Sequence, residues 1–188
     1  TDMSTPLGLT AGNAVEVQES LEVLAGGGPA DVVELTVALA REMLAAAGRG
    51  DVDPADKLSD GSAMDAWRAM ISAQGGDVDA SLPTSRETHV VPAPASGTLT
   101  RLDALAVGLA AWRLGAGRAR KEDAVQAGAG VVWHARPGDE VTEGRPLFTL
   151  HTDEPERFER ALESLEGGFD IGDGSAFTPT PLVIDRVG

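Results

Sequence analysis

The sequence predicts a mixed α+β fold, with a helical first part and a β-rich second part that also carries helices. Before about residue 76, apolar residues recur at helical spacing. After residue 87, short apolar runs alternate with turns rich in Gly and Pro. The stretch 77–87 between them is polar and turn-rich, which is typical of a domain boundary. We therefore expect two domains, 1–86 and 87–188.

Three helices are expected in the first domain. Asn13 and Glu16 have the spacing of a capping box, which opens the first helix. Pro29 suits the first turn of the second helix, and Ser62 is expected to cap the third. Glycines end all three, and the polar stretch 49–60 is expected to be a connector. The helices are thus expected at about 13–25, 29–47 and 62–74.

The second domain is expected to contain short strands and two helices. Asp103 caps a helix that ends at Gly115, and the charged run 155–166 indicates an acidic surface helix. The glycine-rich run 167–174 is expected to separate that helix from a last strand. Two strands are expected within 89–100, and others at 130–135, 146–151 and 182–187.

Composition excludes several classes of function. The chain carries 30 Asp+Glu against 15 Lys+Arg, a net charge of -15, so nucleic acids and anionic membranes are not expected as partners. Cysteine is absent, which excludes disulfides, thiolate metal sites and cysteine nucleophiles. No apolar stretch reaches the length of about 18 residues that a membrane helix needs, and no signal peptide is visible. A cytoplasmic location is expected.

Few motifs carry chemistry by themselves. The three histidines, His89, His134 and His151, lie in or beside predicted strands without metal-ligand spacing, and ordinary strand histidines are the better interpretation. The zinc-protease, serine-hydrolase and Walker motifs are absent. The irregular glycine loop 8–12, which feeds a helix, can point carbonyl oxygens at a cation or N–H groups at an anion.

Two segments of the second domain, 91–99 and 137–147, resemble the two halves of biotinyl and lipoyl carrier domains. Those carriers place a lysine at the tip of a hairpin between the halves. Here the intervening segment 103–130 contains a predicted helix, and its one lysine is Lys121. We therefore expect the flattened sandwich of such domains without their swinging arm.

Three sequence blocks occur in fixed order: residues 1–17 (TDMSTPLG through GNAVEV), 73–77 (AQGGD), and 114–118 (LGAGR) with 121–123 (KED). A GDxVxxGxPLxxxH run follows through His151. Together these motifs resemble the C-terminal part of bacterial thymidine and pyrimidine-nucleoside phosphorylases. The resemblance covers the chain from Thr1 to about Leu165. Thr5 departs from it, since bacterial members usually carry glutamine there.

The resemblance implies a fold and an activity. Residues 1–86 would be the last helices of the family's α/β domain, and 87–188 its C-terminal domain of hammerhead or barrel-sandwich (biotinyl-like) type. The parent enzyme, a pentosyltransferase, would convert thymidine and phosphate reversibly into thymine and 2-deoxyribose 1-phosphate. Its phosphate loop and dimer helices lie upstream in the family, so Thr1 is expected to be internal and the parent a homodimer.

This chain alone is therefore expected to be inactive, with no catalytic residue and no organic cofactor assigned to it. The alternatives are a non-catalytic carrier-like module and a fragment of a nucleotide phosphorylase that acts on nucleoside monophosphates.

The resemblance also implies part of a monovalent-cation site. Bacterial relatives hold the ion, taken as potassium, with two backbone carbonyls and a glutamate of the motif PLGxxxGNAxEVxE, which here spans residues 6–19. These correspond to the carbonyls of Leu7 and Thr10 and the side chain of Glu19. A plain exposed helix glutamate is an equally good interpretation of Glu19.

Overall fold

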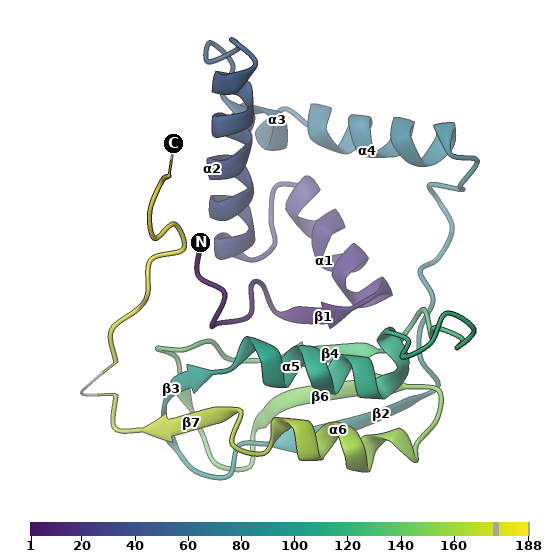
Figure 1. Ribbon diagram of the computed structural model, residues 1–188, viewed down its shortest axis with the longest axis vertical. Helices are drawn as coiled ribbons and strands as arrows, with labels where there is room; N and C mark the ends of the chain where they lie inside the picture. Colours follow the sequence, from purple (N-terminus) through teal and green to yellow (C-terminus); the bar gives the residue numbers. More distant parts are fainter. Residues whose placement is uncertain (175–176, 188) are drawn as a thin grey trace. The chain divides into compact units, whose positions relative to one another are not determined.

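The computed structural model describes residues 1–174 and 177–187, which form two compact units (Figure 1). One unit joins residues 1–16 to the described residues from Pro83 onward. The other spans Val17–Leu82. Each unit is described by itself below.

The unit Val17–Leu82 is built from helices, and the three expected from the sequence are confirmed. The expected connector 49–60 contains a further short helix, α3. Asp53 caps it by accepting the N–H of Ala55 (3.1 Å), and Pro54 occupies its first position. Six residues are too few to show a helical period, so the sequence pattern missed it. The helices are α1 (Ala14–Leu24, which begins in the other unit), α2 (Ala30–Ala46), α3 (Pro54–Ser59) and α4 (Ser62–Ala73).

The expected cap of α4 is wrong by two residues. Ser62 is the first helical residue, and Gly61 before it adopts the left-handed conformation (φ 80°). The capping oxygen comes from Asp60, whose Oδ1 accepts the N–H of Ser62 at 2.8 Å and its hydroxyl at 2.5 Å. Lys57 Nζ lies 3.0 Å from the other oxygen of Asp60. The sequence pattern did not distinguish two candidate capping residues, Asp60 and Ser62, that lie two positions apart.

The carboxyl of Asp60 is expected to titrate well below the ordinary range. Hydrogen bonds from Ser62 chiefly, then from Lys57, lower its pKa from 3.8 to about 2. Because the folded pKa lies below the unfolded one, this carboxylate stabilises the start of α4 above about pH 4, and its contribution is lost as the pH falls through about 2. Carbon-13 NMR titration should give a midpoint near 2, and Ser62→Ala should raise it. A wild-type midpoint near 3.8 would contradict the bonding.

This unit leaves much apolar surface uncovered. Val23 and Val37 are buried, whereas Leu39, Met43 and Met70 are exposed. Apolar surface of this kind marks a face that contacts another part of a protein or another chain.

The other unit contains two small antiparallel sheets. The first has the strand order β1-β4-β6-β2 and the second β5-β3-β7. All neighbouring strands are antiparallel. The strands are β1 (Thr10–Gly12), β2 (Glu87–Pro92), β3 (Gly97–Leu102), β4 (Gly130–Trp133), β5 (Glu140–Val141), β6 (Pro146–Thr152) and β7 (Phe169–Gly172).

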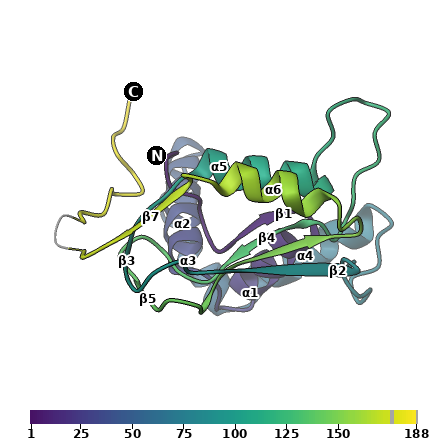
Figure 2. The same cartoon turned by 90° about the horizontal axis from the view of Figure 1, so that it is seen from below.

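Two helices cover one face of the four-stranded sheet, where α5 and α6 lie side by side (Figure 2). Asp103 caps α5 as expected, since its Oδ1 accepts the N–H of Ala106 at 2.9 Å. The helices are α5 (Ala104–Ala111), which continues into a wide π-type turn, η1 (Trp112–Ala116), and α6 (Arg157–Leu165). The core between them and the sheets is fully buried and includes Leu99, Val107, Leu114, Val131, Trp133, Phe148, Leu150 and Ala161. Among the described residues, no helix is long and apolar enough to cross a membrane.

Two expectations for the end of the chain are wrong. The glycine-rich run 167–174 contains a strand, β7, whose Ile171 pairs with Leu99 of β3 and packs against the core. The expected strand 182–187 is irregular, and its Ile184 is 59% exposed. An apolar run forms a strand only where a partner edge is open, and β7 already occupies the edge of β3.

The helix α6 is only partly the surface helix that its charges indicate. Its acidic side chains face outward, but Ala161 and Leu165 are buried in the core. The helix is therefore amphipathic and holds α5 against the sheet.

Candidate functional site

The backbone of Gln126 joins the N-terminal segment to the turn η1. Its N–H donates to the carbonyl of Gly115 at 2.9 Å. The side-chain amide of Asn13 donates to the carbonyls of Gln126 (3.2 Å) and Ala116 (2.8 Å). Asn13 therefore binds two carbonyls far away in the sequence and does not form the expected capping box. The carboxylate of Glu16 accepts the N–H of Gly12, with Oε1 2.7 Å from the nitrogen.

The side chain of Gln126 makes hydrogen bonds to the end of β6 and to the residues after it. Its Oε1 accepts the hydroxyl of Thr152 (3.1 Å) and the N–H of Asp153 (2.7 Å), and its Nε2 donates to Glu154 (3.0 Å). The fully buried Thr152 hydroxyl also lies 2.8 Å from the carbonyl of Leu114. We call Asn13, Gln126, Thr152 and the groups they bind the Gln126 network.

Gly115 fits this network because it has no side chain. Its φ of 106° lies in the left-handed region, and an added Cβ would lie 2.9 Å from the Gln126 amide carbon. Gly115 of the LGAGR block thus kinks η1 and makes room for Gln126.

Two glycines allow the N-terminal strand to approach β4 closely. Gly12 pairs with Gly130. A Cβ at Gly12 would lie 2.5 Å from the carbonyl oxygen of Ala129, and a Cβ at Gly130 would lie 2.7 Å from that of Ala11. The strand β1 within residues 1–16 is therefore a closely packed edge of the four-stranded sheet.

Two of the three expected cation ligands, the carbonyls of Leu7 and Thr10, are close in the sequence and lie at and just before β1. Leu9 accepts the N–H of Trp133 at 3.0 Å, so in the antiparallel ladder the next residue, Thr10, points its carbonyl away from β4. Leu7 lies in the exposed bend just before this edge strand. Glu19 lies half-buried on α1, in the other unit.

The donors of this segment suit a hard cation. Carbonyl oxygens are the ligands such ions take. In addition, the hydroxyl oxygen of Thr10 is buried without a hydrogen-bond partner within the described residues 1–174 and 177–187. The segment 7–10 therefore fits the oxygen ligation expected from the sequence, while the complete ligand set stays a prediction.

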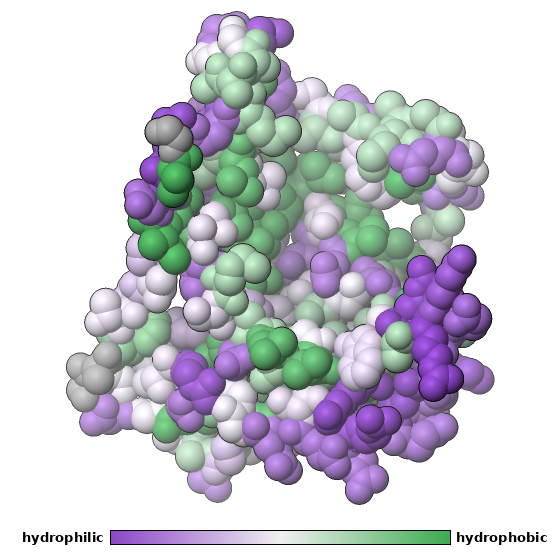
Figure 3. Space-filling model, viewed as in Figure 1, coloured by the Kyte–Doolittle hydropathy of each residue, from purple (hydrophilic) through white to green (hydrophobic). Residues whose placement is uncertain are grey.

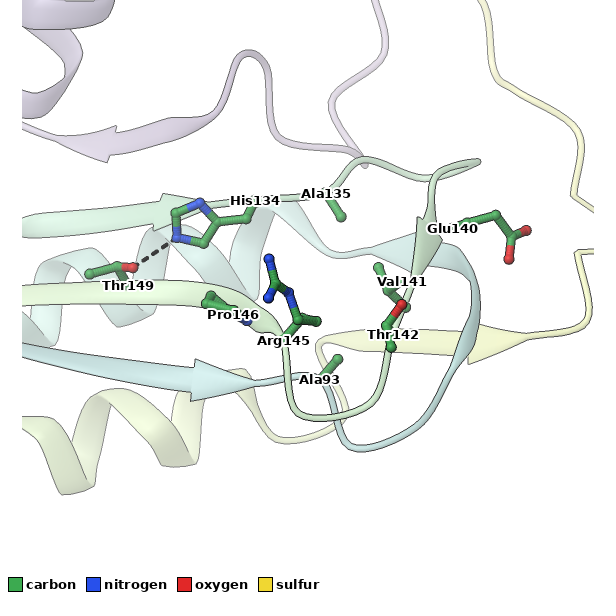
Figure 4. A pocket seen from close by; sticks show the side chains of 9 residues that line it. All are labelled: Ala93, His134, Ala135, Glu140, Val141, Thr142, Arg145, Pro146 and Thr149. Carbon is green, nitrogen blue, oxygen red and sulfur yellow. Dashed lines mark hydrogen bonds between the residues drawn. The ribbon is translucent and has the colours of Figure 1, made fainter.

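A cavity of about 520 Å³ lies between β4, β5 and β6 (Figure 4). His134 Nε2 is 2.8 Å from the hydroxyl of Thr149, and Arg145 lies beside them. The carboxylate of Glu140 points away from His134 and accepts the hydroxyl of Thr98 at 2.6 Å. Glu140 and His134 are therefore not paired as an acid and a base in this cavity.

The three histidines lie where the sequence places them, in β2, after β4 and in β6. Burial, and secondarily the nearby His134, lowers the pKa of the His151 imidazole. In the part of the chain that the structure describes, no group of three or more His, Asp or Glu side chains is arranged to hold a metal ion.

Sequence reasoning missed Gln126 and Thr152. Neither lies in a recognisable motif, since Gln126 follows a polar loop and Thr152 ends an apolar strand. The one available signal was Asn13, a polar residue between a glycine and an apolar helix, and it was interpreted as a cap.

Comparison with known proteins found a matching domain family and similar relatives. Residues 98–172 match the pyrimidine nucleoside phosphorylase C-terminal domain family. The whole chain is 57% identical, over 187 residues, to thymidine phosphorylase of Mycobacterium tuberculosis strain H37Rv and covers 44% of it. It is 36% identical to pyrimidine-nucleoside phosphorylase of Staphylococcus haemolyticus (99% of this chain, 45% of the relative). It is 38% identical to that of Bacillus subtilis (80% of this chain, 37% of the relative).

The chain thus spans less than half the length of these curated relatives. The match extends over the three sequence blocks and over both structural units. The chain therefore belongs to the thymidine and pyrimidine-nucleoside phosphorylases and carries the C-terminal domain of that family.

Proposed function

We propose that this chain is part of a thymidine phosphorylase. The observation that carries the proposal is the 57% identity to a protein of that name across the whole chain. The reaction is the reversible phosphorolysis of thymidine to thymine and 2-deoxyribose 1-phosphate. The bond between the sugar's anomeric carbon and the base nitrogen breaks as a phosphate oxygen bonds to that carbon. The base takes up a proton on leaving, and phosphate remains on the sugar.

The role we propose for this chain is that of a scaffold and lid-side domain. Residues 1–86 carry the last helices of the family's α/β domain, and 87–188 carry a C-terminal domain of hammerhead or barrel-sandwich type. Domain closure over a nucleoside is a rigid-body motion, for which a domain needs a stiff core. The fully buried core between α5, α6 and the sheets supports that role. The whole enzyme is proposed to be a cytoplasmic homodimer.

The test is phosphate-dependent cleavage by the whole protein that contains this chain. Thymidine with phosphate should release thymine and 2-deoxyribose 1-phosphate, measured by chromatography. Uridine in parallel separates a thymidine enzyme from a broader pyrimidine-nucleoside enzyme. Cleavage of nucleoside monophosphates, with none of thymidine or uridine, would overturn the proposal in favour of a nucleotide phosphorylase.

We further propose that the whole enzyme binds a monovalent cation, potassium, through the carbonyls of Leu7 and Thr10 and the carboxylate of Glu19. The outward carbonyl of Thr10 in the edge strand β1 supports this set. The bound ion would order the backbone that holds it, without taking part in bond cleavage.

Glu19→Gln is expected to raise the potassium concentration for half-maximal activity by about tenfold, because it removes the charged ligand of a hard cation. The measurement is the initial rate of thymidine phosphorolysis by the whole protein as potassium chloride is varied. Glu34→Gln makes the same charge change at an exposed position of α2 and should leave the potassium dependence as it is. An unchanged half-maximal concentration in Glu19→Gln would remove Glu19 from the site.

A further inference from the structure

The third sequence block, 114–118 with 121–123, has no part in the proposed reaction. In the structure it forms one wall of a cavity of about 330 Å³. The rest of the lining comes from the first residues of η1, from the neighbouring residues of the loop 117–126, and from Glu154 and the start of α6. Figure 3 shows hydrophilic residues gathered over this region of the surface. The charged side chains that line it are Arg113, Arg118, Arg157, Arg160, Asp123 and Glu154; we call it the arginine pocket.

The charge of the arginine pocket opposes that of the chain. Four of the 15 basic residues line this one cavity, although the whole chain has a net charge of -15. Only two carboxylates line it, so the lining is net positive. Gathering positive side chains raises their mutual repulsion, which an anion in the pocket would relieve.

Both lining carboxylates are already engaged. Glu154 accepts Arg157 Nε at 2.6 Å and the amide of Gln126 at 3.0 Å. The bond from Arg157 chiefly lowers the pKa of Glu154. Asp123 accepts the backbone N–H of Arg120 at 2.8 Å. These carboxylates hold the pocket's walls in place while their charge is partly offset.

The guanidinium groups are positioned by backbone carbonyls. Arg113 donates to the carbonyl of Arg160 at 2.6 Å, and Arg118 to that of Lys121 at 3.3 Å. Arg113 also pairs with Glu163 at 3.2 Å. A guanidinium carries five N–H donors. A bond from one of them to a carbonyl therefore leaves other N–H groups of the same side chain to bind an anion.

We propose that the arginine pocket binds a phosphate-type oxyanion, either inorganic phosphate or the phosphate group of a sugar phosphate. Arginine forks match the tetrahedral oxyanion with paired hydrogen bonds. The volume of about 330 Å³ exceeds that of phosphate alone and accommodates a small phosphorylated sugar. Arg118 and Arg160 are the binding residues, since they line the pocket from two different segments, the one after η1 and α6. Arg157 and Arg113 already pair with Glu154 and Glu163.

A bound anion would also link the arginine pocket to the Gln126 network. Gln126 and Glu154 belong both to that network and to the pocket's lining. An anion held by Arg118 and Arg160 therefore joins the segment 117–125 to α6 at the point where the N-terminal segment is bound.

Proton–nitrogen NMR of the full chain, titrated with inorganic phosphate, tests the proposal. The side-chain N–H signals of Arg118, Arg160 and Trp112, which lines the same pocket, should shift and saturate in the millimolar range. Potassium chloride at matched ionic strength should not produce this shift. A second titration with a sugar phosphate identifies the source: tighter binding than phosphate assigns a phosphorylated sugar, and equal or weaker binding assigns free phosphate.

The double variant Arg118→Gln with Arg160→Gln should weaken the phosphate response of the Trp112 signal by at least about tenfold. Arg68→Gln makes the same kind of charge change at an exposed position of α4. It should leave the phosphate affinity measured from the Trp112 signal within about twofold of the wild-type value. Preserved amide signals of β4 and β6 confirm folding, and Arg160→Gln alone replaces the double variant if they are lost. No saturable shift in the wild type, or equal affinity in the variants, would overturn the proposal.

Discussion

Gln126→Leu is expected to lower the free energy of unfolding by about 2–4 kcal/mol. Leucine keeps the volume of the side chain but removes its amide. The N–H of Asp153 loses its 2.7 Å acceptor, Thr152 loses one of its two oxygen partners, and Glu154 loses a donor. The cost arises because these groups are left without partners in a part-buried site, where water replaces the amide poorly.

The measurement is urea unfolding followed by circular dichroism. Gln126→Glu is the matched control, because a carboxylate still accepts from Thr152 and Asp153 but cannot donate to Glu154 and repels it. It should cost less than the leucine variant at acidic pH, where the new carboxyl is neutral and can donate. A leucine variant within about 0.5 kcal/mol of wild type would show that the network adds no stability.

Gly130→Ala is expected to detach the N-terminal strand from β4. The new Cβ would lie 2.7 Å from the carbonyl oxygen of Ala11 and 2.8 Å from a methyl group of Val15, so the backbone must move. Overpacking of this kind costs about 1–3 kcal/mol. Because β1 is an edge strand, the strain is expected to be released by separation of β1 rather than by unfolding of the core.

Hydrogen exchange locates the effect. The N–H of Trp133, which donates to Leu9, should exchange faster in Gly130→Ala, while the amides of β6 paired with β2 keep their protection. Gly108→Ala is the control, because a Cβ there meets nothing within 4 Å and the residue lies in α5. It should stabilise the chain by up to about 1 kcal/mol. Unchanged exchange at Trp133 would contradict the close packing of residues 1–16.

Most of the regular structure follows from local patterns in the sequence. The helix α2 repeats apolar residues over several turns, and α5 is a short apolar segment that Asp103 caps. The strand β4 is a continuous apolar run, and β6 carries its apolar residues between turn-rich segments. The missed elements have no such pattern. The helix α3 is six residues long, and β7 is a strand only because β3 offers it an open edge. The apolar run 182–187 shows the converse, since it has strand composition and no strand partner.

The candidate sites were predictable to different degrees. The segment of Leu7 and Thr10 could be singled out because an irregular loop rich in glycine directly precedes a helix, and such a loop can direct carbonyl oxygens at a cation. The Gln126 network could not, because Asn13 lies more than a hundred residues before Gln126 and Thr152, and the amide and hydroxyl groups of these residues have no spacing to recognise. Their contacts arise only when β1 pairs with β4 and η1 turns back on Gly115.

Phosphate-dependent thymidine cleavage by this 188-residue chain alone, run beside the whole protein, is the most direct measurement of whether the catalytic groups lie elsewhere. Intact mass of the sample, 19.3 kDa for the chain, shows which species is assayed. The whole protein should release thymine, and the chain alone should release none above the rate without enzyme. Thymine release by the 19.3 kDa chain itself would contradict its role as a non-catalytic C-terminal part of the enzyme.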